Sequence, residues 1–399
     1  MRIGMSVRHY GKQGGISRAC VELAERLARR HEVHVFTSSW AEGMDGGVRL
    51  HKVPILKSNY LFEIASFPIM SSLWNRGRDF EVTHMYGETD GPLSDVITAQ
   101  SCIKAGFIFK KRISQYFIEG AKDSPNFLKK LSNVVKSPLD WMTQKFGLIE
   151  TVALELEERI YRKGNYKKIT TVSKRTKAEI VGLYGVPPED VEVIYNGVNL
   201  EEFHPANRKV YRREIREKHG ISDKEVVILF TGHYFLRKGL ATLIAALPRL
   251  PKGDWRVLVV GSDHPGPFQE MARECGVEKR IVFAGHSGHP GCYYAASDIF
   301  AFPTLHEPFG MVITEAMASA LPVITTRIAG ASELITAGYD GVILNDSLNT
   351  DELAWHLEKL LNNRAMRAVM GFRARKKAEE YSWDKVAEKT EEVYRQVVH

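Results

Sequence analysis

Cysteine is scarce in this sequence, which has four among 399 residues: Cys20, Cys102, Cys275 and Cys292. They are far apart and form no C-x-x-C pair, so the sequence indicates neither a zinc site nor a disulfide framework. Long apolar runs are also missing, because no segment approaches the roughly 20 apolar residues of a membrane-spanning helix. Arg8 interrupts the first apolar stretch, too early for a secretory signal. These absences favour a protein of the reducing cytoplasm over a disulfide-rich secreted or transmembrane one.

The positive charge is distributed unevenly. The formal net charge is +7, and residues 1–199 hold all of it, with 29 Lys and Arg against 22 Asp and Glu. Residues 104–149 alone carry nine basic and three acidic side chains, together with seven aromatic ones. This mixture suits anionic lipid headgroups, which would place the protein on the inner face of the cytoplasmic membrane. A solvated helical insertion with ordinary core aromatics explains it equally well. Nucleic acid would attract the same charge, but we expect no nucleic-acid partner.

A chain of this length exceeds what one hydrophobic core usually supports, so we expect two domains. Each half opens with a strand, a glycine-bearing turn and a helix, which predicts an α/β fold with parallel sheets. The first half begins with a strand over Arg2–Val7, a loop over Gly11–Gly15 and a helix over Ile16–Arg29. The predicted strands of the second half are Val226–Thr231, Trp255–Gly261, Arg280–Ala284, Ile299–Phe302 and Pro322–Thr325.

The polar stretch at Glu201–Pro205 is the expected linker. We therefore expect an N-terminal domain at residues 1–200 and a C-terminal domain at residues 201–381. Residues 382–399 are predicted to form a helix that docks back on the first domain. Ligands of parallel sheets bind outside the carboxyl ends of the strands, so we look for chemistry in a cleft between two facing domains.

Two loops at such strand ends are candidates for holding phosphate. Gly14 and Gly15 open a helix whose N–H groups can receive an anion, although such a glycine pair is more often plain turn chemistry. In the loop Gly232–Gly239, Arg237 and Lys238 come just before a helix, whose dipole disfavours cations unless an anion lies between them. A diphosphate is the natural candidate, and a solvated Arg-Lys pair is the alternative.

Residues 307–315, Glu-Pro-Phe-Gly-Met-Val-Ile-Thr-Glu, combine two carboxylates with a helix start. Gly310 is suited to open the helix, which would leave the N–H groups of Gly310, Met311 and Val312 to bind an anion. Glu307 and Glu315 would then accept hydrogen bonds from sugar and ribose hydroxyls. The plainer alternatives are a helix cap at Glu307 and an ordinary surface position for Glu315.

Together these segments resemble the family-4 retaining glycosyltransferases, which have the two-domain GT-B fold. The resemblance runs through nearly the whole chain, and its ordered set of landmarks is highly specific. These landmarks are Gly14–Arg18, Thr171–Lys174, Val193–Val198, Phe203–Pro205, Arg237–Gly239, Glu307–Glu315 and Leu321–Ile324. The loop Gly232–Gly239 and the basic insertion look most like the bacterial lipopolysaccharide-core glucosyltransferases.

The resemblance implies a role for each site residue. Lys238, helped by Arg237, would neutralise the diphosphate leaving group, and Glu307 would grip the transferred sugar. The other implied donor-binding residues are Gly14, Gly15, His233, Ile281, Val282, Phe309, Gly310, Met311, Val312 and Glu315. Of these, Gly15 would back the phosphates, Glu315 would bind the ribose hydroxyls, and Ile281 and Val282 would contact the base.

Two positions depart from the family pattern. Many members have Arg where His233 stands. Part of the positive charge that the protein usually places against the diphosphate is therefore absent, or depends on protonation of His233. Many also have His where Gln100 falls on the acceptor side, and Gln cannot serve as a general base. A mechanism in which the departing phosphate takes the acceptor proton on the same face would need no side-chain base.

We therefore expect a retaining glycosyltransferase that moves a hexose from a nucleotide-diphosphate sugar, with UDP favoured, to a glycan or glycolipid such as a lipopolysaccharide core. No cofactor or metal is expected, because Lys, Arg and helix-terminus N–H groups can stabilise the leaving group. His286 and His289 lie in a turn with Gly288 and Pro290, which argues against a metal site. The competing interpretations are a glycoside hydrolase that uses Glu307 and Glu315, a nucleotide-sugar epimerase, and a non-catalytic sugar- or lipid-binding protein of the same fold.

Overall fold

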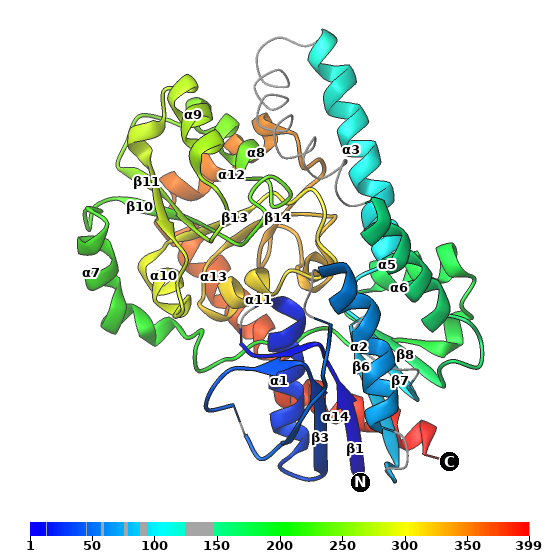
Figure 1. Cartoon of the computed structure of the whole chain (residues 1–399). Coiled ribbons are helices and arrows are strands. Elements are labelled where there is room, and N and C mark those ends of the chain that lie inside the picture. Colours follow the sequence, from blue (N-terminus) through cyan, green and yellow to red (C-terminus); the bar gives the residue numbers. More distant parts are fainter. Residues whose placement is uncertain are drawn as a thin grey trace. The chain divides into compact units, whose positions relative to one another are not determined.

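A computed structural model describes the chain except residues 13, 45, 57–59, 76–78, 88–93, 124–146 and 399. The chain forms two compact units. Of the described residues, the first unit comprises 1–111, 147–197 and 383–398, and the second comprises 112–123 and 198–382. Each has its own parallel sheet (Figure 1), which confirms the predicted fold of two Rossmann-like domains. The predicted domain limits at residues 200 and 381 stay a proposal.

The first unit is built on a seven-stranded parallel sheet in the order β5-β3-β1-β6-β7-β8-β9. Its strands are β1 (Arg2–Ser6), β3 (Glu32–Thr37), β5 (Arg49–Lys52), β6 (Val82–Tyr86), β7 (Val96–Ala99), β8 (Lys168–Thr171) and β9 (Val191–Val193). Two short strands, β2 (His9–Tyr10) and β4 (Ser39–Trp40), pair separately. The helices that begin in this unit are α1 (Gly15–Leu27), α2 (Tyr60–Asn75), α3 (Ile103–Asp123), α5 (Gly147–Ile160), α6 (Lys174–Tyr184) and α14 (Trp383–Val397).

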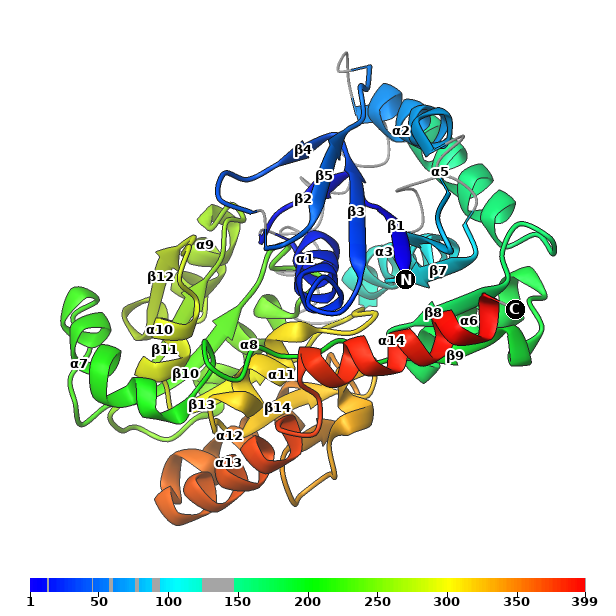
Figure 2. The same cartoon turned by 90° about the horizontal axis from the view of Figure 1, so that it is seen from below.

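The C-terminal helix α14 returns to the first unit and packs against α1 (Figure 2). Its buried Tyr394 hydroxyl lies 2.6 Å from Nδ1 of His84, which is itself fully buried on β6. Burial lowers the pKa of His84 to about 3, so the ring is neutral at pH 7. The sequence predicts this docking from the helical spacing of the last apolar residues.

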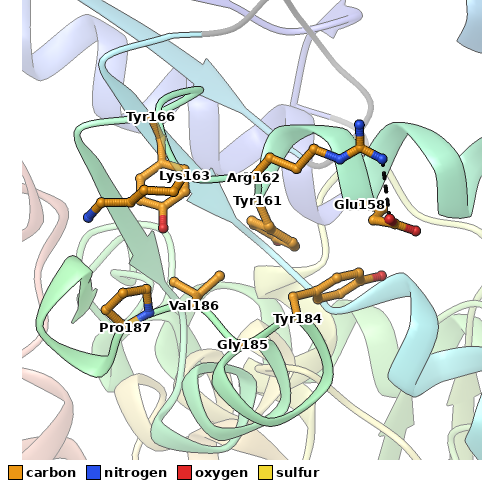
Figure 3. A pocket seen from close by; sticks show the side chains of 9 residues that line it. All are labelled: Glu158, Tyr161, Arg162, Lys163, Tyr166, Tyr184, Gly185, Val186 and Pro187. Carbon is orange, nitrogen blue, oxygen red and sulfur yellow. Dashed lines mark hydrogen bonds and ion pairs between the residues drawn. The ribbon is translucent and has the colours of Figure 1, made fainter.

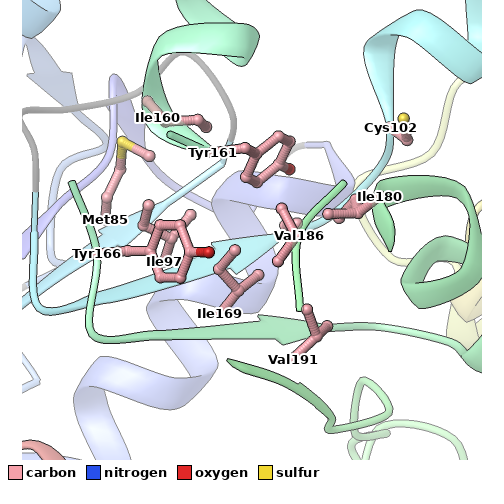
Figure 4. Packing of buried hydrophobic residues seen from close by; sticks show 11 residues of the cluster. Met85, Ile97, Cys102, Ile160, Tyr161, Tyr166, Ile169, Ile180, Val186 and Val191 are labelled. Carbon is pink, nitrogen blue, oxygen red and sulfur yellow. The ribbon is translucent and has the colours of Figure 1, made fainter. Parts of the chain in front are cut away.

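An apolar cluster holds α5 and α6 against the sheet of the first unit (Figure 4). Strands β6 to β8 contribute Met85, Ile97 and Ile169, and α6 contributes the fully buried Ile180. Burying one such side chain stabilises a fold by about 1.5–3 kcal/mol. The alternation of short apolar strands with amphipathic helices therefore encodes this layer directly.

The second unit has a six-stranded parallel sheet in the order β12-β11-β10-β13-β14-β15. Its strands are β10 (Val226–Thr231), β11 (Trp255–Val260), β12 (Ile281–Gly285), β13 (Ile299–Phe302), β14 (Val323–Thr326) and β15 (Val342–Leu344). Its helices are α7 (Arg208–Lys218), α8 (Leu240–Ala246), α9 (Gly266–Glu274), α10 (Gly291–Ala296), α11 (Met311–Ala318), α12 (Thr350–Asn362) and α13 (Arg364–Ala378). Figure 1 shows α8, α9 and α12 on one side of this sheet and α10, α11 and α13 on the other. The five strands predicted here agree with β10 to β14 to within a residue.

One carboxylate of the second unit joins three arginines of α7. Asp298, between α10 and β13, pairs with Arg208 at 2.8 Å, Arg212 at 3.1 Å and Arg216 at 2.6 Å. The same arginines donate to the last carbonyls of α10, at Ala296 and Ser297. Because cations are favoured at a helix C-terminus, this cluster fixes the end of α10 and ties α7 to it.

The basic segment 104–149 is described only in part, and residues 124–146 lie outside the described residues. Within α3, Lys110 pairs with Glu150 of α5 at 2.9 Å, whereas Lys111 and Arg112 are exposed. The helix start is held by Glu157, whose carboxylate accepts from the N–H groups of Ile103 and Lys104. Among the described residues, no helix is long and apolar enough to span a membrane.

We predict that Asp298→Asn lowers the free energy of unfolding by about 3 kcal/mol, because removing the carboxylate charge leaves the buried guanidinium groups of α7 without their counter-charge. Burial alone would raise the pKa of Asp298, but Arg212, the Val227 N–H group and Arg216 hold it below its ordinary value. The carboxylate therefore stabilises the fold fully above about pH 3.9, and its contribution disappears as the pH falls through the lowered pKa.

Urea unfolding of Asp298→Asn at pH 7 and in acid measures this difference. Glu217→Gln, which removes an exposed partner of Arg213 on the same helix, is the control and should change stability by less than about 1 kcal/mol. Equal stability of the two variants would contradict the structural role of Asp298.

Candidate active site

Two of the predicted donor-site residues of the second unit, Lys238 and Glu307, meet at the point where its strand order reverses. The chain leaves β10 toward β11 on one side and later enters β13 on the other. At such a switch point, the loops at the carboxyl ends of the two strands diverge and leave room for a ligand. The loop after β10 contributes Lys238, and the loop after β13 contributes Glu307.

The loop after β10 closes as a tight turn against the loop after β13. Lys238 donates its backbone N–H to Tyr234 O at 3.1 Å, and Gly239 ends the turn with φ of 84°. A Cβ atom at Gly239 would lie 1.9 Å from the carbonyl oxygen of Pro303, so only glycine fits. The close approach brings Lys238 next to the second loop.

Lys238 and Glu307 form an ion pair across these two loops. The two side chains are only 12% and 10% exposed. Burial, and the neighbouring charge of Arg237, lower the pKa of Lys238 well below its ordinary value. A buried ammonium group is unfavourable without a counter-charge, so Lys238 needs an anion, and here Glu307 supplies it.

Arg237 points to the backbone rather than to a carboxylate. Its Nη1 donates to the carbonyl of His306 at 3.1 Å, and its own carbonyl accepts from the Thr304 hydroxyl at 3.0 Å and the Leu305 N–H group at 2.8 Å. Arg237 therefore joins the loops after β10 and β13 and adds positive charge beside Lys238. The sequence gives no sign of this bracing role.

Helix α11 begins where the sequence predicts. Gly310 is its N-cap with φ of 96°, and a Cβ atom there would lie 2.9 Å from Cγ of Glu307. No side chain caps this helix, and the first N–H groups of a helix have no partner within it. Glu307 is thus not a helix cap, which excludes that alternative. The segment that precedes the helix is anchored, because the carbonyls of Glu307 and Phe309 accept hydrogen bonds from the N–H groups of Gly330 and Ala331.

Glu315, one turn into α11, is buried and not an ordinary surface residue. Its Oε2 accepts a hydrogen bond from the Tyr294 hydroxyl of α10 at 2.8 Å. Sequence analysis did not single out Tyr294, because no spacing or motif links it to a residue 21 positions away.

Of the remaining donor-side residues, His233 follows the carboxyl end of β10, whereas Ile281 and Val282 lie toward the amino end of β12. His233 contacts the Ser262 hydroxyl at 2.6 Å and stacks on His286 with ring centroids 6.0 Å apart. Burial, His286 and Lys238 lower the pKa of His233, so the ring is neutral at pH 7. Ile281 and Val282 begin the edge strand β12. Across the described part of the chain, no group of three or more His, Cys, Asp or Glu residues could hold a metal ion.

The first unit holds the other predicted residues. Gly14 is the N-cap of α1 with φ of 82°, and Gly15 is the first residue of that helix. Gln100 follows β7 and exchanges two hydrogen bonds with the side-chain amide of Asn196, at 3.0 and 3.3 Å. Both amides are buried. Gln100 is thus held by a partner that the sequence did not reveal, and its amide cannot accept a proton as a base.

A pocket of about 200 Å³ lies elsewhere in the first unit (Figure 3). It is lined by Glu158, Tyr161, Arg162, Lys163, Tyr166, Tyr184, Gly185, Val186 and Pro187. These residues precede β8 and β9, so the pocket lies at the amino ends of the strands, opposite the edge that carries Gln100. None of the predicted site residues lines it.

Two Rossmann-like units, each built on a parallel sheet, are the architecture of the GT-B fold. Comparison with known families agrees. The family model described as "Glycosyl transferases group 1" matches residues 211–377, and that described as "Glycosyltransferase Family 4" matches residues 140–202. The second unit is a group 1 glycosyltransferase domain.

Individual relatives are more distant. An uncharacterized glycosyltransferase of Methanocaldococcus jannaschii is 32% identical over 233 residues, which cover 57% of this chain and 60% of that protein. The lipopolysaccharide glucosyltransferase WaaG of Escherichia coli is 23% identical over 98% of both chains, and a crystal structure of WaaG matches with a TM-score of 0.75 at 22% identity over 97% and 98% of the two chains. A structure of Anabaena HepE in complex with UDP and glucose has a TM-score of 0.65 at 20% identity, over 98% of both chains. At these identities the structural matches show the fold.

We predict that Gly310→Ala weakens binding of a nucleoside diphosphate at least about tenfold. A side chain at this φ is strained by about 1–2 kcal/mol, and its Cβ atom would displace Glu307. Gly338→Ala is a matched control, because Gly338 also has a positive φ, of 78°, but its Cβ atom would meet nothing within 4 Å. Calorimetric titration of both variants measures the effect, and equal affinities would contradict the assigned geometry.

Proposed function

We propose that this protein transfers a hexose from a nucleotide-diphosphate sugar to a glycan or glycolipid acceptor, with retention of the anomeric configuration and without a metal ion. The observation that carries the proposal is the buried Lys238–Glu307 pair at the switch point of the second sheet. A buried cation next to a helix start whose N–H groups have no side-chain cap suits a ligand with concentrated negative charge.

A diphosphate would take over the role of Glu307 as the partner of Lys238. Its oxygens would accept hydrogen bonds from Lys238 and from the first N–H groups of α11, at Gly310, Met311 and Val312. Glu307, released from Lys238, could then accept hydrogen bonds from hydroxyls of the transferred sugar, and Phe309 would shape that part of the site. Glu315 would bind the ribose hydroxyls.

The chemistry follows from where charge develops. When the bond from the sugar to the β-phosphate breaks, negative charge grows on the departing phosphate, and the Lys238 ammonium group and the helix N–H groups stabilise it. Arg237 adds positive charge close by. Because Gln100 is bound to Asn196 and cannot act as a base, the departing phosphate is the group that we propose takes the acceptor proton on the same face.

The nature of the donor and acceptor rests on the relatives. HepE has been crystallised with UDP and glucose, which supports a UDP-sugar as the donor. WaaG is a lipopolysaccharide glucosyltransferase, which supports a lipopolysaccharide core as the acceptor class. Ile281 and Val282, on the edge strand of the second sheet, are the proposed contacts to the base. His233, neutral at pH 7, would add charge to the diphosphate site only when protonated.

The hydrolase alternative has less support. A glycosidase needs one carboxyl group as a proton donor and a second as a nucleophile or base. Here Glu307 is paired with Lys238, and Glu315 accepts a hydrogen bond from Tyr294, so both carboxyl groups already have partners. An epimerase or a non-catalytic binding protein of the same fold is separated by assay, because only a transferase forms a new glycosidic bond.

We predict that Lys238→Ala lowers kcat by about 10²–10³-fold, the usual loss when one preorganised donor to the leaving group is removed. Transfer from UDP-, GDP- and ADP-sugars is measured with a panel of glycan and glycolipid acceptors. Lys252→Ala, which changes an exposed lysine of the same unit, should leave kcat unchanged. Near-normal turnover of Lys238→Ala would overturn its assignment, and sugar released to water with no transfer to an acceptor would favour the hydrolase.

We also propose that the basic segment 104–149 binds the anionic inner face of the cytoplasmic membrane. Charge reversal at the exposed Lys111 and Arg112 should weaken binding to phosphatidylglycerol-containing vesicles by at least about tenfold, since each basic residue contributes about 1 kcal/mol. Added salt should weaken the binding of the unmodified protein as well. Reversal of the exposed Lys385 and Lys389 on α14 is the control. Equal binding to neutral phosphatidylcholine vesicles would contradict the proposal.

A further inference from the structure

Tyr294 is a buried polar residue next to the proposed donor site, and nothing in the proposed chemistry uses it. It lies on α10, its side chain is fully buried, and its hydroxyl contacts two other polar side chains. The hydroxyl lies 2.8 Å from Oε2 of Glu315 and 3.1 Å from Oγ1 of Thr231, the last residue of β10. Tyr294 thus connects the end of the central strand to α11.

The chemistry of the groups fixes the direction of these hydrogen bonds. A carboxylate only accepts, and Oε2 of Glu315 at 2.8 Å is a nearer acceptor than the Val312 carbonyl at 3.4 Å, so the single Tyr294 proton is donated to Glu315. The tyrosine oxygen can then only accept from Thr231, whose hydroxyl must be the donor. The result is an ordered chain from Thr231 through Tyr294 to Glu315. A hydrogen bond to a charged group is stronger than one between neutral groups, so the chain fixes the orientation of the Glu315 carboxylate.

The ring of Tyr294 is itself held on both sides. Phe203 meets it edge-on with centroids 5.2 Å apart, and Phe300 of β13 lies 5.9 Å away. The end of α10 is fixed two residues later by Arg212 and Arg216, which donate to the Ala296 carbonyl. The position of the hydroxyl is therefore set by Phe203, by Phe300 of β13 and by the arginines of α7.

We infer that Tyr294 is a positioning residue for donor recognition, which orients the Glu315 carboxylate toward the ribose hydroxyls of the nucleotide. This inference rests on the proposed function, because it requires Glu315 to bind ribose. It assigns the tyrosine a part in binding the nucleoside and no part in breaking the glycosidic bond. Loss of its hydroxyl should therefore affect donor affinity and leave the chemical step unchanged.

The test compares UDP with 2′,3′-dideoxy-UDP in the full-length protein. Tyr294→Phe keeps the ring and removes the hydroxyl, so it should bind UDP about tenfold more weakly, as expected for a lost hydrogen bond to a charged group. Its affinity for dideoxy-UDP should equal that of the unmodified protein, because that ligand has no ribose hydroxyls for Glu315 to bind. In transfer assays, KM for the donor should rise by the same factor while kcat stays constant.

Two further variants serve as controls. Tyr293→Phe changes the neighbouring tyrosine of α10, whose hydroxyl faces His219 at 3.4 Å, and it should leave both affinities unchanged. Thr231→Val removes the hydroxyl that donates to Tyr294 and should weaken UDP binding in the same direction, but less. Thermal unfolding checks that each variant is folded.

A Tyr294→Phe protein that loses affinity for both nucleotides equally would overturn the inference, since that pattern means general damage to the site. Unchanged UDP affinity would overturn it too. If the unmodified protein binds UDP and dideoxy-UDP equally, Glu315 does not recognise ribose and the inference fails, while sugar transfer and its loss in Lys238→Ala still test the proposed function separately. If transfer is absent with every donor, the proposed function itself fails.

Discussion

The buried pair of Lys238 and Glu307 is the interaction on which the active-site account depends. A buried ammonium group is unfavourable unless a negative charge lies against it. The pair forms at the point where the sheet leaves room for a ligand. We propose that the carboxylate fills this position when the site is empty and that the donor diphosphate fills it during the reaction, which frees Glu307 to face the sugar.

The surrounding fold keeps these two residues in place with little freedom. Gly239 lets the turn after β10 approach Pro303, and Arg237 ties that turn to the carbonyl of His306. Gly310 lets α11 begin directly against Glu307. Further away, Asp298 and the arginines of α7 fix the end of α10, which carries Tyr294. The site thus depends on rigid backbone junctions that only glycine permits and on buried hydrogen bonds.

Local features of this fold could be predicted from the sequence, whereas pairings between distant residues could not. The strands Val226–Thr231 and Ile299–Phe302 are found as predicted, because apolar runs bounded by turn residues are local signals. The helix start at Gly310 is also local. The partners of the site residues depend on the folded chain: Lys238 and Glu307 are 69 positions apart, and Gln100 and Asn196 are 96 apart. The sequence therefore led us to assign Glu307 to the sugar without its link to Lys238, and it did not reveal Tyr294.

A crystal structure of the protein with UDP bound tests the central claim most directly. We predict that the β-phosphate lies within hydrogen-bond distance of Nζ of Lys238 and of the first N–H groups of α11. The Glu307 carboxylate should be displaced from Lys238. Because a carboxylate and a diphosphate placed against the same ammonium group repel each other, the Glu307 carboxylate should move away from Lys238 when the diphosphate binds. A structure in which the Lys238–Glu307 pair stays intact and UDP binds elsewhere would contradict the account.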